Sequence, residues 1–286
     1  MTGRPGPDLV DAHHHVWDLA VRDQDWITGP GLAPLRRTFT LDDLAPHARA
    51  ARVAATVLVQ TVTVPDETPE LLALADRDPL VAAVVGWTDL TAPGVADALA
   101  ALRARPGGHR LAGIRHQVQD EPDPAWLLRP DVRRGLAAVA AEGLVYDLVV
   151  RPHQLPAAAR AAALLPQLTF VLDHLGKPPV ADGALEPWAG HVRALAALPN
   201  TVCKLSGLVT EADRHTWTPA SLAPYADTVL DAFGPGRLMF GSDWPVCLLA
   251  ASYADVVDTA RRLTDGLSRD ERDAVFAGTA TRVYGL

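Results

Sequence analysis

Short apolar runs alternate with longer helical segments along this chain of 286 residues. The runs are rich in Val, Leu and Ile, and each is short enough for a buried strand. They predict eight strands, at Leu9–His15, Val53–Gln60, Val81–Trp87, Leu111–His116, Leu144–Val150, Thr169–His174, Thr201–Ser206 and Arg237–Ser242. Between most of them, apolar residues recur at helical spacing, as in Thr91–Ala104, Pro130–Glu142, Pro156–Leu165, Glu186–Leu198 and Pro219–Phe233.

This alternation determines the expected fold class. Strands joined by helices pair in parallel, and eight such units over about 250 residues are typical of a closed (β/α)8 barrel, the TIM-type α/β fold. An open, doubly wound sheet is the alternative, but no Gly-rich phosphate-binding turn follows the first strand. We expect a single domain, residues 1–286, in which Ser268–Tyr284 forms the last outer helix.

Two long segments lack helical or strand periodicity. Trp17–Thr40 follows the first predicted strand, and Gln117–Pro130 follows the fourth. Loops of this length inside a compact domain are usually functional. In a barrel both would lie at the carboxyl ends of the strands, where such enzymes place their active sites. We therefore expect both segments to border the active-site mouth.

Composition and charge exclude several functional classes. No apolar run reaches the roughly 18 residues of a membrane helix, and Met1–Pro7 leads into a polar strand without the apolar stretch of a signal peptide. We therefore expect a cytoplasmic protein without membrane contact. The net charge is −8, and no cluster of Lys and Arg favours nucleic-acid binding. Cys203 and Cys247 are too few for a disulfide framework and lack thiolate metal-site spacing.

Lysine is rare in this sequence. Only Lys177 and Lys204 among the 26 basic residues are lysine, and the others are arginine. Arg does not replace a compact ammonium group on a flexible stem. The two remaining lysines are therefore candidates for a specific role, with chance retention as the alternative.

Candidate catalytic side chains stand at the ends of three predicted strands. In Asp11-Ala12-His13-His14-His15, alternate residues share a face, so His13 and His15 point the same way. His174 ends the sixth strand, and Asp243 follows the eighth. Because catalytic groups of barrels gather at the carboxyl ends of strands, we expect these side chains to meet at one point. Three imidazoles and a carboxylate around one point can activate water for hydrolysis.

The same residues form the pattern of a known family. His-X-His on the first strand, His on the sixth and Asp on the eighth resemble the amidohydrolase superfamily. The segments DAHHHVWD, GIRHQVQDEPD, LDHLGKP, KLSGL and FGSDWPV occur in order between about residues 9 and 248 and are similar to its sugar-lactonase branch. The resemblance implies a lactonase that opens a sugar-acid lactone, such as L-fuconolactone or L-rhamnonolactone, by attack of activated water on the ester carbonyl.

For this reaction we hypothesise that Asp243 takes a proton from water. His174, or the pair His13 and His15, would stabilise the tetrahedral oxyanion, and His174 has the alternative role of protonating the leaving hydroxyl. Binuclear members of the family carry a bridging Lys or Glu on strand four and a His on strand five. Neither strand supplies its ligand cleanly here, since strand four ends in Arg115-His116 and His153 lies beyond the end of strand five. His13, His15 and Asp243 would hold one divalent ion, with zinc favoured, and a metal-independent reaction stays open.

Polar groups at the other strand ends are the expected substrate ligands. A neutral, polyhydroxylated lactone suits mixed polar contacts, and an aromatic ring can stack on the apolar face of the sugar. The candidates are Arg115, His116, Asp147, Lys204, Trp26 and Trp244. Asp147 has the alternative role of a buried acid paired with Arg115 or Lys204.

Two other functions remain open on the same fold. One is hydrolysis of a pyrone-type or muconate-type lactone, and the other is metal-dependent decarboxylation. A pyrone dicarboxylate would need several convergent arginines, and only Arg115 and Arg151 are evident. The sequence does not indicate the oligomeric state.

Overall fold

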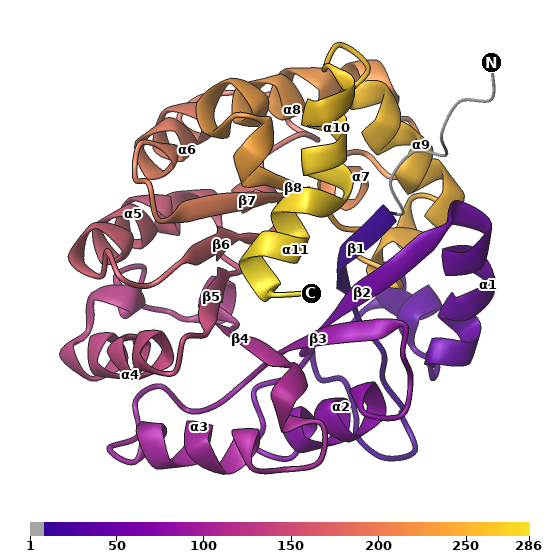
Figure 1. Ribbon diagram of the computed structural model, residues 1–286. Coiled ribbons are helices and arrows are strands. Elements are labelled where there is room, and N and C mark those ends of the chain that lie inside the picture. Colours follow the sequence, from indigo (N-terminus) through magenta and orange to yellow (C-terminus); the bar gives the residue numbers. More distant parts are fainter. Residues whose placement is uncertain (1–8) are drawn as a thin grey trace.

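The computed structural model describes residues 9–286, in which eight parallel strands form one sheet in sequential order (Figure 1). The strands are β1 (Leu9–His14), β2 (Val53–Val59), β3 (Val81–Gly86), β4 (Leu111–His116), β5 (Val145–Leu148), β6 (Phe170–Leu172), β7 (Thr201–Leu205) and β8 (Leu238–Phe240). Each lies within a predicted strand. The predicted TIM-type barrel is confirmed, and residues 1–8 of the predicted domain, which include all of Met1–Pro7, lie outside the described part.

The first and last strands meet and bring two candidate catalytic segments together. The backbone nitrogen of Asp243 donates to the carbonyl of His13 at 2.8 Å, and that of His15 donates to the carbonyl of Trp244 at 2.7 Å. The carboxylate of Asp11 adds a side-chain link, because its Oδ1 accepts from the backbone nitrogen of Ser242 at 2.8 Å. The His-rich end of β1 is thereby fixed beside the segment that follows β8.

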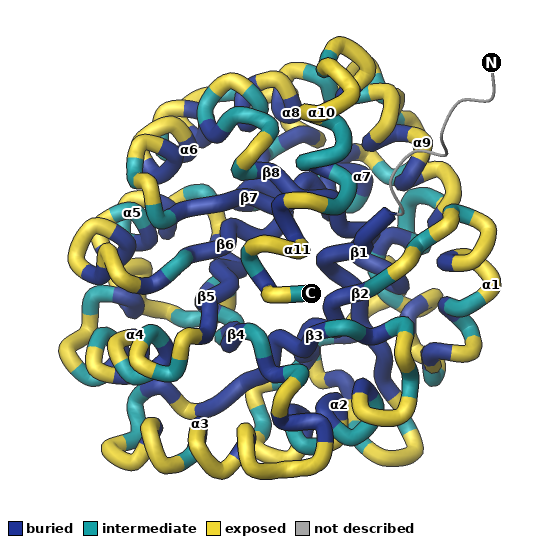
Figure 2. Tube along the Cα trace, viewed as in Figure 1, coloured by how far each residue is buried: buried dark blue, intermediate teal, exposed yellow. Residues whose placement is uncertain are grey.

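Helices surround the sheet and cover its outer face (Figure 1). They are α1 (Leu41–Ala51), α2 (Glu67–Ala75), α3 (Val95–Arg103), α4 (Pro130–Ala141), α5 (Leu155–Leu164), α6 (Trp188–Ala196), the short α7 (Leu208–Glu211), α8 (Pro219–Phe233) and α9 (Tyr253–Leu263). Capping boxes define where several begin, as at Thr40 before α1 and Ser252 before α9. Figure 2 shows the buried strands and the exposed outer surface of the helices.

The predicted helix at the end of the chain is present, but its predicted outer position was wrong. Within Ser268–Tyr284, α10 (Arg269–Asp273), a π-helical turn at Ala274–Gly278 and α11 (Thr279–Tyr284) follow one another without a break. Residues of α11 pack with the small interior cluster of the barrel, among side chains such as Val10 and Met239. Figure 1 shows α11 at the centre of the ring of strands. Helical spacing reveals a buried face but not the surface that covers it.

The two long segments contain short helical turns. Within Trp17–Thr40, residues Pro30–Leu35 form the 3-10 helix η1, and Trp17 pairs with Phe39 in an antiparallel bridge. The segment Gln117–Pro130 holds η3 (Val118–Asp120) and η4 (Trp126–Leu128). Both predicted loops contribute residues to the cavity described below. Over residues 9–286, no helix has the length and apolar character needed to cross a membrane.

Candidate active site

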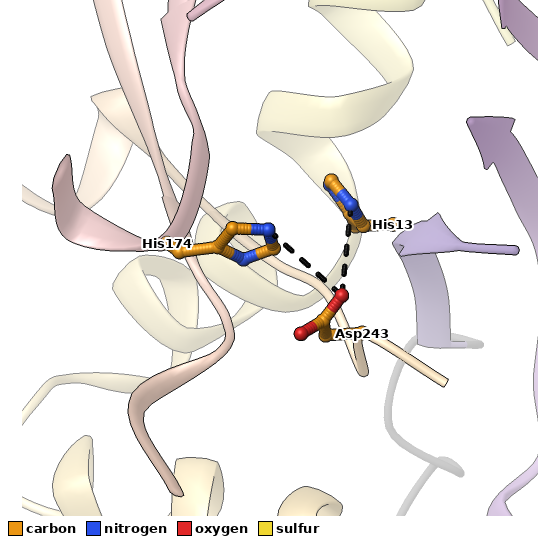
Figure 3. Close-up of side chains that lie close together, drawn as sticks. All are labelled: His13, His174 and Asp243. Carbon is orange, nitrogen blue, oxygen red and sulfur yellow. Dashed lines mark ion pairs between the residues drawn. The ribbon is translucent and has the colours of Figure 1, made fainter. Parts of the chain in front are cut away.

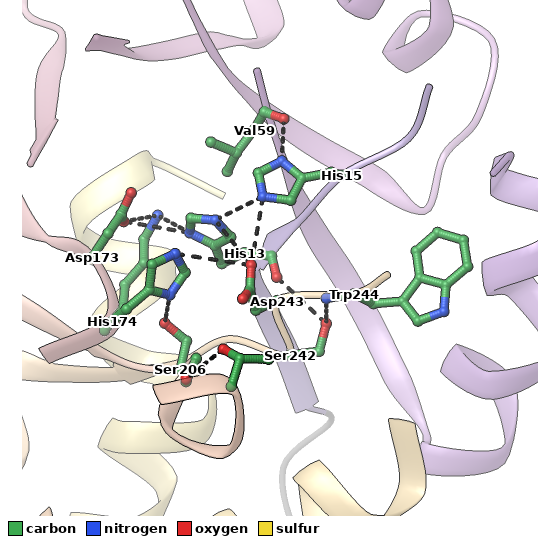
Figure 4. A network of polar contacts seen from close by, with 12 residues as sticks. His13, His15, Val59, Asp173, His174, Ser206, Ser242, Asp243 and Trp244 are labelled. Carbon is green, nitrogen blue, oxygen red and sulfur yellow. Dashed lines mark hydrogen bonds and ion pairs between the residues drawn. The ribbon is translucent and has the colours of Figure 1, made fainter. Parts of the chain in front are cut away.

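Four side chains from the first, sixth and eighth strand ends converge, as the sequence predicted. The Oδ1 oxygen of Asp243 lies 3.5 Å from Nε2 of His15 and 3.8 Å from Nε2 of both His13 and His174. Figure 3 shows the rings of His13 and His174 next to the carboxylate of Asp243, and Figure 4 adds His15. All four are buried. The structure therefore places three imidazoles and one carboxylate around a common point.

The backbone at two of these residues adopts an unusual conformation. His174 has φ of 52° and Asp243 has φ of 57°, and Leu175 and Lys177 are also in the left-handed region. L-residues rarely adopt this conformation, because it costs free energy, and it persists where the surrounding structure enforces it. Such residues cluster at functional sites, which supports the assignment of these strand ends as the reactive part of the molecule.

One hydrogen bond determines the tautomer of His15. Its Nδ1 lies 2.7 Å from the carbonyl oxygen of Val59, which can only accept, so Nδ1 carries the hydrogen. The lone pair of His15 is therefore on Nε2, which faces Asp243. Metal-binding histidines are typically oriented in this way by a carbonyl or carboxylate on the other ring nitrogen.

The donor set fits a divalent metal ion. The Nε2 atoms of His13 and His15 lie 3.1 Å apart, close to the roughly 3.3 Å between two nitrogen ligands of a tetrahedral zinc ion. Asp243 adds a carboxylate oxygen, and potential ligand atoms of His13, His174 and Asp243 all lie within 4.8 Å of one another. Imidazole nitrogen and carboxylate oxygen are ligands that zinc accepts.

A buried network of charges lies against His13. The ammonium of Lys204 is 2.5 Å from Oδ2 of Asp147, 3.0 Å from Oδ1 of Asp173 and 3.1 Å from Nδ1 of His13. Arg115 binds the other oxygen of Asp173 at 3.0 Å. Two cations and two carboxylates balance one another here, which buried charges require. Burial acts to raise the pKa of Asp173, but Lys204, His13 and Arg115 hold it well below its usual value.

Burial and charge give His174 and Asp243 different protonation states. Burial lowers the pKa of His174 to about 4, although Asp243 and Asp173 act against this shift. The imidazole is therefore neutral near pH 7. Burial acts to raise the pKa of Asp243, but His174 and His15 outweigh it and the net shift is downward. An ionised carboxylate next to a neutral imidazole is a proton acceptor beside a hydrogen-bond donor.

A cavity of about 480 Å³ opens above this cluster. Three of the converging residues line it, namely His15, His174 and Asp243, whereas His13 lies behind them. The sequence-predicted substrate ligands Arg115, His116 and Trp26 also line it. Lys177, the other rare lysine, lies at the wall, with its ammonium 3.4 Å from Glu211. A cavity of this size accommodates a small ring-shaped ligand.

Three of the predicted substrate ligands are not in this cavity. Asp147 and Lys204 have no exposed surface and bind one another inside the barrel. Trp244 is only 1% exposed, and its ring packs edge-to-face on Phe39. The geometry therefore does not support substrate contact by these three residues. It agrees with the alternative interpretation of Asp147 as a buried acid paired with Lys204.

Sequence reasoning missed a residue that supports the cavity wall. Glu67, at the start of α2, accepts hydrogen bonds from the backbone nitrogens of Thr61 and Val62 and from the hydroxyl of Thr61. Both of these residues line the cavity. An acid in the first turn of a helix is ordinary, so no sequence pattern indicates that Glu67 is buried.

Comparison with known proteins places this geometry in context. The amidohydrolase family model matches residues 10–286. An L-fucono-1,5-lactonase of Burkholderia multivorans is 46% identical over 288 residues, covering 97% of this chain and 96% of the relative. An L-fucono-1,5-lactonase of Burkholderia ambifaria is 39% identical, with 97% and 95% covered. A crystal structure of a B. multivorans amidohydrolase with bound zinc superposes with a TM-score of 0.92 at 45% identity, covering 98% of this chain and 100% of that one.

Proposed function

Because this chain belongs to the amidohydrolase family, whose model matches residues 10–286, we propose that it hydrolyses a sugar-acid lactone such as L-fucono-1,5-lactone. One structural observation carries the proposal. The carboxylate of Asp243 lies within 3.8 Å of three imidazole nitrogens, and three of these four residues line the cavity. Opening a lactone requires a proton acceptor for water and a donor for the developing oxyanion, and this arrangement supplies both.

In this proposal Asp243 accepts the proton of the attacking water. Its lowered pKa keeps it ionised at neutral pH. His174 is neutral, and its Nδ1 lies 2.9 Å from the hydroxyl oxygen of Ser206. When Ser206 donates to Nδ1, Nε2 of His174 carries the hydrogen and donates it to the oxyanion or to the leaving hydroxyl. Arg115 adds a fixed positive charge at the cavity wall.

His13, His15 and Asp243 are the residues that would hold a divalent ion, and we propose zinc. Such an ion acts as a Lewis acid on an ester carbonyl. The tautomer of His15 set by Val59 supports this assignment, as does the 3.1 Å separation of the two Nε2 atoms.

The charges of the cavity favour a neutral sugar lactone over a dianion. Asp25, Asp120 and Glu121 line the wall together with Asp243. The guanidinium of Arg115 is already engaged by Asp173 at 3.0 Å. A dicarboxylate would meet more negative than positive charge at this wall, whereas the hydroxyls of a sugar find acceptors there.

A screen of sugar lactones with a pH indicator, with and without chelator, tests the proposal. We expect acid release from L-fucono-1,5-lactone, and we expect Asp243→Asn to lower kcat by about 10²- to 10⁴-fold. Asp258→Asn, on the outer face of α9, is the control and should behave as the wild type. No acid release from any sugar lactone, or wild-type turnover in the Asp243 variant, would contradict the proposal.

A further inference from the structure

Three side chains form a hydrogen-bonded relay along one wall of the cavity, which we call the Glu121 relay. The indole nitrogen of Trp87 lies 3.0 Å from Nδ1 of His116, and Nε2 of His116 lies 2.7 Å from Oε1 of Glu121. The ring of His116 also stacks on Trp126, with centroids 4.3 Å apart and planes 6° from parallel. Packing and hydrogen bonds therefore fix His116 in one orientation.

The direction of the hydrogen bonds in the relay is determined by chemistry. An indole N–H only donates, so Nδ1 of His116 must accept and carries no hydrogen. His116 is therefore neutral, with its hydrogen on Nε2, and this hydrogen is donated to Glu121. Burial also lowers the pKa of His116, against the opposing effect of Glu121, which agrees with a neutral ring.

One oxygen of Glu121 remains available to a ligand. His116 occupies Oε1, whereas Oε2 makes no hydrogen bond to any residue between 9 and 286. His116 and Glu121 both line the cavity, together with the reactive residues His174 and Asp243. The Glu121 side chain is 26% exposed, so a molecule in the cavity can reach it. A small ligand can therefore occupy a cavity that presents both the reactive residues and an oriented carboxylate.

We propose that Glu121, oriented by Trp87 through His116, is the specificity-determining residue that binds hydroxyl groups of the lactone. A carboxylate accepts hydrogen bonds from sugar hydroxyls, and its orientation selects where those hydroxyls lie on the ring. Trp87 and His116 are positioning residues in this relay. The inference rests on the proposed function, because it assumes a hydroxylated lactone as substrate.

The test compares two lactones, L-fucono-1,5-lactone and δ-valerolactone, which has a six-membered lactone ring without hydroxyls. The measured quantity is the ratio of kcat/KM for the hydroxylated lactone to that for the plain lactone. Glu121→Gln should lower this ratio about 10- to 100-fold, the range for loss of a hydrogen bond to a charged group. Asp123→Asn is the matched control, since it removes a charge from the same Gln117–Pro130 segment at an exposed residue that does not line the cavity, and it should keep the wild-type ratio.

A second variant tests the relay itself. Trp87→Phe keeps an aromatic ring but removes the donor to His116. The ratio of the two kcat/KM values should therefore fall, as it does in Glu121→Gln. Nitrogen NMR should then show His116 leaving its single Nε2–H form. An unchanged ratio in Glu121→Gln, or an equal fall in Asp123→Asn, would overturn the inference. A wild-type protein that hydrolyses neither lactone would instead overturn the proposed function.

Discussion

The phenol oxygen of Tyr284 lies 2.9 Å from Oδ2 and 3.1 Å from Oδ1 of Asp147. This contact ties α11, the last helix, to the carboxylate that binds Lys204 inside the barrel. Lys204 in turn contacts His13 of the candidate active site. The end of the chain therefore stabilises a charge network that reaches the reactive residues from within the barrel.

Tyr284→Phe should destabilise the fold. The change removes one hydroxyl from a fully buried carboxylate, and loss of a buried hydrogen bond to a charged group costs about 1.5–3 kcal/mol. Urea unfolding followed by circular dichroism measures the free energy of unfolding. Tyr225→Phe is the matched control, because its hydroxyl makes only long hydrogen bonds, of 3.3 and 3.5 Å. An equal loss of unfolding free energy in both variants would show that the contact with Asp147 stabilises the fold no more than the long hydrogen bonds of Tyr225 do.

The proposed metal site predicts a contrast between adjacent histidines. His15→Gln should lower zinc affinity by roughly 100-fold or more, since it removes a ligand. His14→Gln should retain the metal, because His14 faces the other side of β1 and its Nε2 contacts Thr56 at 2.9 Å. Elemental analysis and zinc titration calorimetry measure stoichiometry and affinity without reference to turnover. Equal zinc affinity in the two variants would exclude His15 as a ligand.

The sequence predicted the parts of the fold and site that depend on local periodicity. Apolar runs and helical spacing located the eight strands and the barrel, and the rule that catalytic groups follow strand ends located His13, His15, His174 and Asp243. The position of α11 could not be predicted in this way. A helix with one buried face can pack on the outside of a barrel or across its end, and periodicity is the same in both cases.

Long-range pairing limited the prediction of the substrate site. Asp147 and Lys204 stand at strand positions where a polar residue suggests ligand contact, but each finds its partner on another strand. Trp244 likewise packs on Phe39, more than 200 positions away in the sequence. Glu67 was missed because the two backbone nitrogens it binds carry no sequence signature. Which polar groups are satisfied inside the protein emerges only from the tertiary structure.

Acid should destabilise this protein through His14. Burial lowers its pKa in the folded state to about 3, from an ordinary 6.5. Between these values the unfolded chain binds a proton that the folded chain does not, so stability present above pH 6.5 is lost as the pH falls. The expected contribution is at most about 1.4 kcal/mol per pH unit. The free energy of unfolding, measured at pH 7, 6 and 5, should fall with pH less steeply in His14→Gln than in the wild type. The difference between the two slopes should correspond to about one proton, and equal slopes would contradict a neutral His14.

Gly207 allows His174 to occupy its position in the site. Gly207 has φ of 68°, and a Cβ atom there would lie 2.7 Å from Nδ1 of His174 and 2.8 Å from its Cγ. Gly207→Ala therefore carries two separate penalties. The left-handed backbone costs about 1–2 kcal/mol with a side chain present, and the methyl group also displaces the imidazole from Ser206. Because a shift of about 1 Å in a catalytic group can cost 10²-fold in rate, kcat should fall by about that factor.

Gly234→Ala separates these two penalties. Gly234 has φ of 72°, but a Cβ atom there would have no neighbour within 4 Å. Gly234→Ala should lose at least as much stability in urea unfolding as Gly207→Ala, since φ of 72° and ψ of 156° lie in a region that is essentially confined to glycine. Only Gly207→Ala should lose turnover on the lactone. Equal kcat in the two variants would show that the ring of His174 need not be held where it lies. A fall in kcat confined to Gly207→Ala would assign the effect to the position of this imidazole rather than to general destabilisation.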